Sequence, residues 1–208
     1  MEIIAHRGFW KKWDERNQLE AFKRSSEANI GTETDFRDFC GKLVISHNVA
    51  DRNCLDAEEF FRLYEGTTNT LAINIKADGL QELLRDLLLK YKIDNYFCFD
   101  MSVPDTLLYP ENNLKFFVRE SEYETINCLY EKADGVWVDG FQDDAWITKR
   151  LIKDHRERGK KVCIVSSDLH KRDYSMLWEE ISDNEILDDN GIILCTDYPD
   201  KAKEYFYG

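Results

Sequence analysis

Short apolar runs alternate with amphipathic stretches along the whole chain. The apolar runs are rich in residues that favour β-strands, and eight of them lie at 2–5, 32–36, 71–76, 96–99, 114–118, 135–138, 161–165 and 191–195. Stretches that predict helices follow at 17–29, 56–65, 79–91, 103–108, 120–132, 143–158, 173–181 and 198–207. The clearest is 79–91, because its leucines form an i, i+3, i+4, i+7 stripe. Strands that alternate with helices predict a sheet of parallel strands.

The number of strand–helix units predicts the fold. Eight units fit an α/β protein with a closed (β/α)8 barrel of the TIM type, and a doubly wound open sheet is the competing architecture. We expect one compact barrel domain over residues 1–208, because the chain has the size of a single domain. This barrel typically needs about 250 residues, so the fourth and eighth helices should be short.

One segment breaks the alternation of strands and helices. Residues 38–42 separate two β-like runs without a helix, and Gly41 lies where a tight turn is needed. We therefore expect a β-hairpin that extends the second strand. Such a hairpin would lead His47, which ends the returning run, back towards the second strand.

The composition limits which molecules this protein can bind. The formal net charge of −13 makes nucleic acids and anionic membranes poor partners, whereas a small phosphoester stays compatible with it. No run approaches the roughly 18 apolar residues of a membrane span. No basic region followed by a long apolar stretch marks a signal peptide, so we expect a cytoplasmic location. The six cysteines include no Cys-x-x-Cys pair and indicate no disulfide framework, and the oligomeric state stays open.

Residues suited to phosphodiester chemistry gather in the first forty-eight positions. His6 and Arg7 end the first apolar run, and His47 ends another. Glu33 and Asp35 are two residues apart in the second predicted strand, so both point to the same face and can bind one cation together. Strand ends are where α/β barrels place their chemistry. The set predicts a metal-assisted site that cleaves a phosphodiester.

The same residues resemble the N-terminal pattern of the glycerophosphodiester phosphodiesterase family. That pattern has a His-Arg-Gly turn, an asparagine that opens the first helix, a Glu-x-Asp pair and a second histidine after a strand. The matching positions are His6-Arg7-Gly8, Asn17, Glu33-Thr34-Asp35 and His47, and the segment 195–200 is similar to the family's closing segment. The resemblance implies a TIM barrel, a divalent cation (Mg2+ or Ca2+) and hydrolysis of a phosphodiester to an alcohol and a phosphomonoester.

The resemblance also implies a role for each matching residue. His6 and His47 would form the acid–base pair, which suits a side chain that titrates near neutrality. Arg7 would contact the phosphate with paired donors. Glu33 and Asp35 would bind the cation, which polarises the phosphoryl oxygens.

Four positions on the following strands and the first loop modify this interpretation. The family usually has a glutamate where this chain has Asn74, whose carbonyl oxygen can still bind Mg2+ or Ca2+. Asp100, at the end of the fourth strand, is the best candidate to replace the lost charge. Lys76 shares a face with Asn74 and matches a family lysine that can neutralise phosphate charge. Arg16 stands where the family usually has an acidic residue, so we expect a substrate pocket that differs from one recognising glycerol.

Later strand ends supply two further candidates. Arg119 and Trp137 are expected near the mouth of the barrel, where they could contact a small-molecule phosphodiester; packing is the alternative for Trp137. His155 and His170 lie in charged contexts and are expected to be exposed. Two other functions stay open: a phospholipase-D-like lyase that forms a cyclic phosphate, and a non-catalytic barrel that only binds a phosphoester. The sequence favours the metal-dependent hydrolase.

Overall fold

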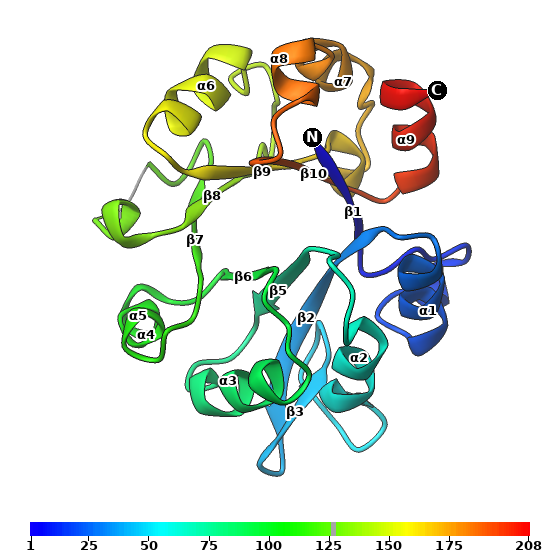
Figure 1. Ribbon diagram of the computed structural model, residues 1–208, viewed down its shortest axis with the longest axis vertical. Helices are drawn as coiled ribbons and strands as arrows, with labels where there is room; N and C mark the ends of the chain where they lie inside the picture. The colour runs from blue at the N-terminus through cyan, green and yellow to red at the C-terminus, as the bar shows by residue number, and fades with distance from the viewer. Residues whose placement is uncertain (126–127) are drawn as a thin grey trace. The chain divides into compact units, whose positions relative to one another are not determined.

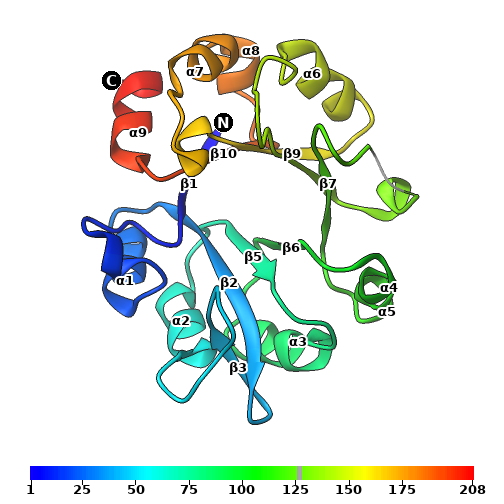
Figure 2. The same ribbon diagram turned by 180° about the vertical axis from the view of Figure 1, so that it is seen from behind.

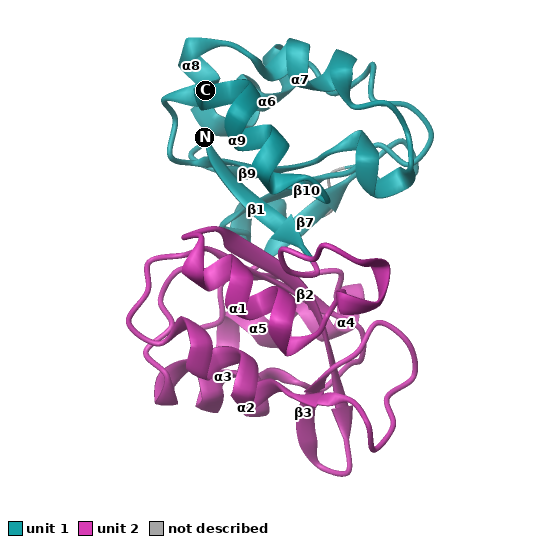
Figure 3. Ribbon diagram, turned by 90° about the vertical axis from the view of Figure 1, so that its right-hand side faces the viewer, with its two compact units in different colours: residues 1–6, 117–208 teal, residues 7–116 magenta. Residues whose placement is uncertain are grey.

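Parallel strands and helices alternate through the protein (Figure 1). The structure is a computed structural model that describes residues 1–125 and 128–208. The chain groups into two compact units, one of residues 7–116 and one of residues 1–6 with 117–208 (Figure 3). That residues 1–208 form a single domain stays a prediction.

The unit of residues 7–116 is built on three parallel strands with an antiparallel extension. Its strands are β2 (Gly31–Phe39), β3 (Lys42–Ile45), β4 (Leu55–Asp56), β5 (Leu71–Ile75) and β6 (Tyr96–Phe99). Its helices are α1 (Leu19–Glu27), α2 (Ala57–Tyr64), α3 (Gln81–Lys90), α4 (Val103–Thr106) and α5 (Leu108–Glu111), with a 3-10 turn at Trp13–Glu15. Strand β5 pairs in parallel with both β2 and β6. Strands β3 and β4 extend the sheet from β2 in antiparallel register.

The predicted hairpin after the second strand is present. Strands β2 and β3 leave Cys40 and Gly41 as a two-residue turn. Both residues have positive φ, +50° and +76°, as a type I′ turn requires. After β3, the Ser46 amide donates to the Asp35 carbonyl at 2.9 Å. The returning chain therefore holds His47 beside β2.

The unit of residues 1–6 and 117–208 contains an all-parallel sheet. Its strands are β1 (Glu2–His6), β7 (Phe117–Glu120), β8 (Gly135–Val138), β9 (Lys161–Val165) and β10 (Ile192–Thr196). Its helices are α6 (Lys149–Glu157), α7 (Ser175–Ile181), α8 (Asn184–Leu187) and α9 (Pro199–Tyr207), with 3-10 turns at Tyr130–Lys132 and Ser167–His170. The strand order is β1-β10-β9-β8-β7. Helices α6 to α9 lie along one face of this sheet (Figures 1 and 2).

Each unit buries its own aromatic cluster. In the first, the Phe60 ring on α2 lies 4.8 Å from Phe22 on α1 and 5.7 Å from Phe36 on β2. In the second, Trp178 on α7 lies 5.4 Å from Phe206 on α9. Burying a side chain of this size stabilises a fold by roughly 1.5–3 kcal/mol. In the first unit these contacts hold α1 and α2 against β2, and in the second they hold α7 against α9.

Three predicted elements differ in the structure. Strand β7 covers residues 117–120 instead of 114–118, and only an isolated bridge between Cys98 and Phe116 precedes it. The helix predicted for 120–132 is wrong for the described part of that range, which has bends, turns and one 3-10 turn; residues 126–127 lie outside the described residues. The helix predicted from residue 143 starts only at Lys149, after a cap by the Thr148 side chain.

Two predictions from composition can be compared with the structure. Within the described ranges, no helix is both long enough and apolar enough to cross a membrane. The six cysteines are free thiols, and Cys98, Cys163 and Cys195 are buried. Buried thiols of this kind pack as small apolar side chains.

Candidate active site

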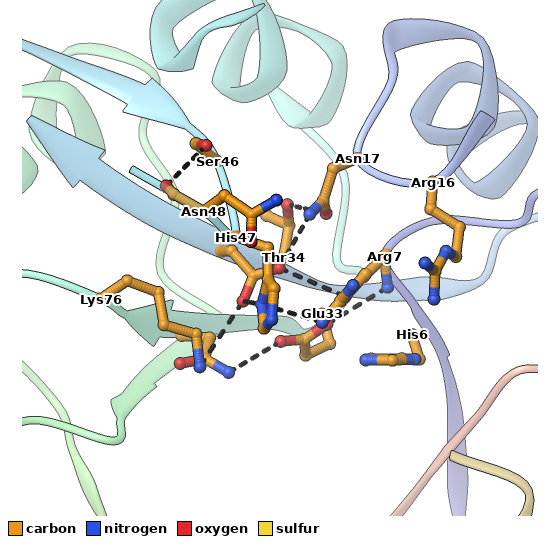
Figure 4. Close-up of polar contacts among 12 residues, drawn as sticks. His6, Arg7, Arg16, Asn17, Glu33, Thr34, Ser46, His47, Asn48 and Lys76 are labelled. Atoms are coloured by element: carbon orange, nitrogen blue, oxygen red, sulfur yellow. Dashed lines mark hydrogen bonds and ion pairs between the residues drawn. The ribbon is translucent and has the colours of Figure 1, made fainter. Parts of the chain in front are cut away.

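Asp35 on β2 is the centre of a cluster of basic side chains. Three of these side chains, Arg7, His47 and Lys76, are labelled in Figure 4. Its Oδ1 lies 3.2 Å from His47 Nδ1 and 3.6 Å from Lys76 Nζ. Its Oδ2 lies 3.3 Å from Arg7 Nε. Burial alone would raise the pKa of Asp35, but the His47 hydrogen bond and the Arg7 and Lys76 charges outweigh it and hold the pKa well below its usual range. An ionised Asp35 therefore keeps three basic groups together at neutral pH.

Asn17 orients Asp35 and the arginine turn. Its Nδ2 donates to Asp35 Oδ2 at 2.8 Å, and its Oδ1 accepts from Thr34 Oγ1 at 2.8 Å. Its backbone amide donates to the Arg7 carbonyl at 3.0 Å. Arg7 and Asn17 both adopt left-handed backbone, with φ of +57° and +58°. For an arginine this conformation is strained, and such strain gathers where the surrounding structure fixes a functional side chain.

Glu33 and Asn74 supply oxygen atoms beside this cluster. Glu33 is 1% exposed, and its two carboxylate oxygens accept from Asn74 Nδ2 and from the Arg7 amide, each at 3.2 Å. The carbonyl oxygen of Asn74 is buried and accepts no hydrogen bond from any described residue. Asp100 lies 3.4 Å from Lys76 Nζ and has a left-handed φ of +68°.

These oxygen atoms fit a hard divalent cation. Buried carbonyl oxygens normally have a partner, so the unmatched Asn74 oxygen indicates a group that the protein itself does not supply. In the described part of the chain, no three His, Cys, Asp or Glu side chains are arranged to hold a metal. A cation here would need Asn74 in addition to Glu33 and Asp35. Asp100 as a replacement ligand stays a prediction, because the structure shows it beside Lys76.

His6 ends β1 and is held by a carboxylate. Its Nδ1 lies 2.7 Å from Asp197 Oδ1, in the residue that follows β10. The Asp197 amide in turn donates to Asp168 Oδ2 at 2.6 Å. Asp168 also accepts from the Thr196 hydroxyl at 3.0 Å and from the Ser166 hydroxyl. Burial raises the pKa of Asp168. A Nδ1–H donated to Asp197 leaves Nε2 as the basic nitrogen of His6.

The later candidates occupy the unit that contains His6. Arg119 lies within β7, and its Nη1 is 2.5 Å from Asp139 Oδ2. The other Asp139 oxygen lies 2.7 Å from His170 Nε2. Trp137 lies within β8 and is 3% exposed. The roles of Arg119 and Trp137 in substrate binding stay predictions.

A polar pocket of about 440 Å³ adjoins the Asp35 cluster. Arg7 and His47 form part of its wall. Other lining residues come from the loop before α1 and the loop after β3: Trp13, Arg16, Asn17, Gln18, Ile45, Ser46, Asn48, Val49, Asp51, Asn53, Cys54 and Leu55. The pocket places room for a substrate group directly beside two predicted site residues.

The structure brings most early site residues together. Within the unit of residues 7–116, six predicted residues form one network: Arg7, Glu33, Asp35, His47, Asn74 and Lys76. His6 directly precedes Arg7 in the chain. Sequence reasoning did not assign the positioning residues Asn17, Asp168 and Asp197. The signal for two of them was present, since Asn17 and the segment 195–200 both belong to the family-like pattern.

The comparisons with known proteins bear on the fold. No family model matches the chain, and no curated protein sequence is significantly similar. A solved protein of Galdieria sulphuraria, assigned as a glycerophosphodiester phosphodiesterase, superposes with a TM-score of 0.77 at 17% identity, over 100% of this chain and 98% of that one. A glycerophosphodiester phosphodiesterase from Agrobacterium tumefaciens gives 0.74 at 14% identity, over 100% of both chains. One from Parabacteroides distasonis gives 0.72 at 17% identity, over 99% and 96%.

These structures confirm two predictions. The chain shares its fold with glycerophosphodiester phosphodiesterases over essentially its whole length, as the sequence resemblance implied. The predicted fold class, an α/β barrel of the TIM type, is confirmed with it.

Proposed function

We propose that this protein is a phosphoric diester hydrolase that cleaves a small glycerophosphodiester-like compound or headgroup. The observation that carries the proposal is the buried Asp35 with Arg7, Lys76 and His47 gathered around it. Such a cluster attracts a phosphodiester anion and contains a titratable imidazole. The shared fold with glycerophosphodiester phosphodiesterases supports the same reaction class.

In this mechanism the two histidines divide the proton transfers. One imidazole takes a proton from the attacking water, and the other gives a proton to the oxygen of the leaving alcohol. The products are an alcohol and a phosphomonoester, and the net proton count is unchanged. Asp197 holds His6 with Nε2 as the basic nitrogen. His47 Nδ1 faces both Asp35, at 3.2 Å, and Arg7 Nη2, at 2.9 Å.

Because of these two contacts, His47 Nδ1 can form either of two hydrogen bonds. With a proton on Nδ1, the ring donates to Asp35; without it, Nδ1 accepts from the Arg7 guanidinium. Either setting fixes the ring plane and leaves Nε2 to exchange a proton with the substrate. Arg7 and Lys76 carry the charge that offsets the phosphate.

A divalent cation, Mg2+ or Ca2+, belongs to the proposal. Glu33, Asp35 and the Asn74 carbonyl would hold it, and it would polarise a phosphoryl oxygen. Chelation with EDTA should remove activity, and added Mg2+ or Ca2+ should restore it. Asn74→Glu supplies a third carboxylate, so titration calorimetry should show the cation binding about tenfold more tightly, whereas Asn74→Ala should weaken it. Unchanged affinity in both variants would remove Asn74 from the ligand set.

The test of the function is turnover of a panel of glycerophosphodiesters followed by phosphorus NMR. We expect a phosphomonoester product, and losses of at least about a hundredfold in kcat for His6→Ala and His47→Ala. Thermal melts of both variants check that they stay folded. A cyclic phosphate product would show that the protein is a lyase and not a hydrolase. Phosphoester binding without turnover, in the metal-loaded protein, would overturn an enzymatic role.

A further inference from the structure

A second pocket lies in the unit of residues 1–6 and 117–208, which is the teal unit of Figure 3. Its wall consists of residues from the segment before α6 and from the segment that runs from the end of β9 through α7. Its volume is about 360 Å³, and small-molecule sites usually have about 300–1,000 Å³. None of the residues assigned to phosphodiester cleavage lines it, so this pocket is a separate candidate site.

Carboxylates dominate the charged lining of this pocket. Four carboxylates face one guanidinium, that of Arg172, and they belong to Asp143, Asp144, Asp173 and Glu180. Arg172 Nη2 lies 2.6 Å from Asp144 Oδ1, so the charge of this arginine is matched within the wall. The other three carboxylates form no ion pair with a described residue. The lining therefore has an excess of negative charge that favours a cation.

The loop of residues 140–144, which forms part of the wall, is fixed from two sides. Arg172 donates to the carbonyl groups of Gly140 and Phe141, at 2.6 and 2.7 Å. The Glu122 carboxylate accepts from three backbone amides of the same loop, each at 3.0 Å. The wall is therefore organised before a ligand arrives, which reduces the ordering that binding must cost.

A buried hydroxyl group at this pocket has no partner. Ser167 lines the pocket and is 1% exposed. Its Oγ is buried and forms no hydrogen bond with any described residue. Buried polar atoms normally have a partner, so this hydroxyl indicates a ligand group that the chain itself does not supply. An ammonium group suits this role, because a hydroxyl oxygen accepts hydrogen bonds from N–H donors.

The rest of the lining favours an organic cation over a metal ion. Across residues 1–125 and 128–208, no three His, Cys, Asp or Glu side chains are arranged to hold a metal. The pocket also has apolar walls, from Ile147, Met176 and Leu177. Ile147 and Leu177 are buried, whereas Met176 is 82% exposed. A cation that carries a hydrocarbon chain matches both the acidic and the apolar parts of this lining.

We propose that this pocket binds a small alkyl amine, with its ammonium group at the carboxylates and the Ser167 hydroxyl and its hydrocarbon chain against Ile147 and Leu177. The inference is independent of the proposed phosphodiesterase function. A neutral alcohol of the same length keeps the apolar contacts but leaves the carboxylates without a counterion. It should therefore bind more weakly than the amine.

The experiment compares 1-aminopentane with pentan-1-ol by calorimetry and by NMR mapping of backbone amide shifts. About 150 mM salt screens non-specific attraction to the acidic surface. The amine should bind wild type at least about tenfold more tightly than the alcohol. Its shifts should gather in residues 142–148 and 167–180, which include the pocket lining.

Two neighbouring glutamates give a matched pair of variants. Glu180→Gln should weaken binding of the amine about fivefold, because it removes a charge from the lining but keeps an oxygen for the Lys149 amide. Glu179→Gln should leave the affinity unchanged, because Glu179 is exposed on the same helix and does not line the pocket. Ser167→Ala should weaken binding of the amine about threefold without lowering the melting temperature, since the hydroxyl has no partner in the folded chain.

Three results would overturn the proposal: equal affinity for amine and alcohol, shifts that lie outside the pocket, or equal weakening by Glu179→Gln and Glu180→Gln. A further arm tests the source of the ammonium group with Nα-acetyl-lysine methylamide. Tighter binding of this capped lysine than of 1-aminopentane would also overturn the small amine, and would assign the pocket to a lysine side chain of a partner protein.

Discussion

At the scale of single residues, two carboxylates fix the position of His6. Asp197 bonds His6 at 2.7 Å, and Asp168 fixes Asp197 through its amide. The Thr196 hydroxyl also donates to Asp168, so Asp168 binds both the Asp197 amide and the side chain of the preceding residue. Partners of this kind set the tautomer and orientation of an imidazole, and the proposed hydrolysis would need both.

Replacing the Asp197 carboxylate should therefore impair catalysis without unfolding the protein. Asp197→Asn keeps an oxygen for the His6 Nδ1–H but loses the negative charge that favours imidazolium. We expect kcat to fall by about a hundredfold or more, with a small change in KM. The limb of the pH–rate profile that reports imidazole protonation should move to lower pH. Asp200→Asn, in the same segment but exposed, is the control; an unshifted profile in Asp197→Asn would reduce Asp197 to a structural role.

The lowered pKa of Asp35 predicts how the free energy of unfolding depends on pH. Its pKa in the folded protein lies below the ordinary value of 3.8, so its ionised form stabilises the fold above about pH 4, and this contribution fades as the pH falls further. Asp35→Asn should lower the unfolding free energy by about 3 kcal/mol at pH 7, because Arg7, Lys76 and His47 lose their buried counterion. Urea unfolding at pH 7 and pH 3 should show the gap to wild type closing at the lower pH.

The control for this prediction lies on the same strand. Asp38 is on β2 but exposed, and Asp38→Asn should leave the unfolding free energy nearly unchanged at both pH values. A gap between Asp35→Asn and wild type that stays constant from pH 7 to pH 3 would contradict the electrostatic explanation.

Two histidines show where local sequence was a poor guide. His155 and His170 were expected to be exposed, because charged residues surround them in the sequence. His155 is only 3% exposed, since its ring lies 2.8 Å from Glu120 and 3.0 Å from the Tyr130 hydroxyl. His170 is partly buried against Asp139. All three partners lie at least 25 positions away, so only the tertiary fold could identify them.

At the scale of elements, Gly8 determines how closely α1 approaches the turn that carries Arg7. Its φ is +84°, and a Cβ there would lie 2.9 Å from both Ala21 Cβ and Phe22 Cδ1. Gly79 has the same φ of +84°, but a Cβ there would meet no atom within 4 Å. The two positions therefore share the same φ but differ in how closely other atoms pack against them.

Comparing alanine substitutions at Gly8 and Gly79 measures how much close packing at Gly8 contributes to stability. Gly8→Ala should destabilise the protein by about 2 kcal/mol more than Gly79→Ala, because overpacking adds to the backbone strain that both variants share. Chemical denaturation measures the difference. We also expect Gly8→Ala to raise KM, since a displaced α1 moves the Arg7 turn. Equal destabilisation by both substitutions would mean that α1 relaxes without loss.

The prediction of a helix was wrong where a side chain forms hydrogen bonds to a distant segment of the chain. The helix expected over 120–132 needs Glu122 on a helix face. Instead, hydrogen bonds from the amides of Phe141, Gln142 and Asp143 to its carboxylate lower its pKa to about 2, against the effect of burial. Glu122 thus organises a loop that is far away in the sequence. The local pattern of apolar and polar residues holds no information on such a contact.

The elements that were predicted correctly depend on local information. The strands at 96–99, 135–138 and 161–165 have the predicted bounds, because short apolar runs bordered by polar residues mark them. The β2–β3 hairpin was recognisable from Gly41, since a positive φ is required there. The Asp35 network was predictable only in part. Residue type and spacing indicated Glu33 and Asp35, whereas the number of basic groups around Asp35 follows from three separate segments of the folded chain.

At the scale of the whole molecule, the net charge of −13 opposes the approach of a phosphodiester anion. The Debye length shortens from about 30 Å at 10 mM salt to about 8 Å at 150 mM. Salt in this range screens the long-range repulsion, whereas contacts of 3–4 Å such as those around Asp35 are screened much less. For an anionic phosphodiester, kcat/KM should therefore rise by about two- to fivefold between 10 and 150 mM NaCl. A zwitterionic choline diester, with no net charge, should respond less and serves as the control. A fall in kcat/KM for the anionic diester over the same range would mean that the basic groups near Arg7 and Arg16 outweigh the field of the whole chain.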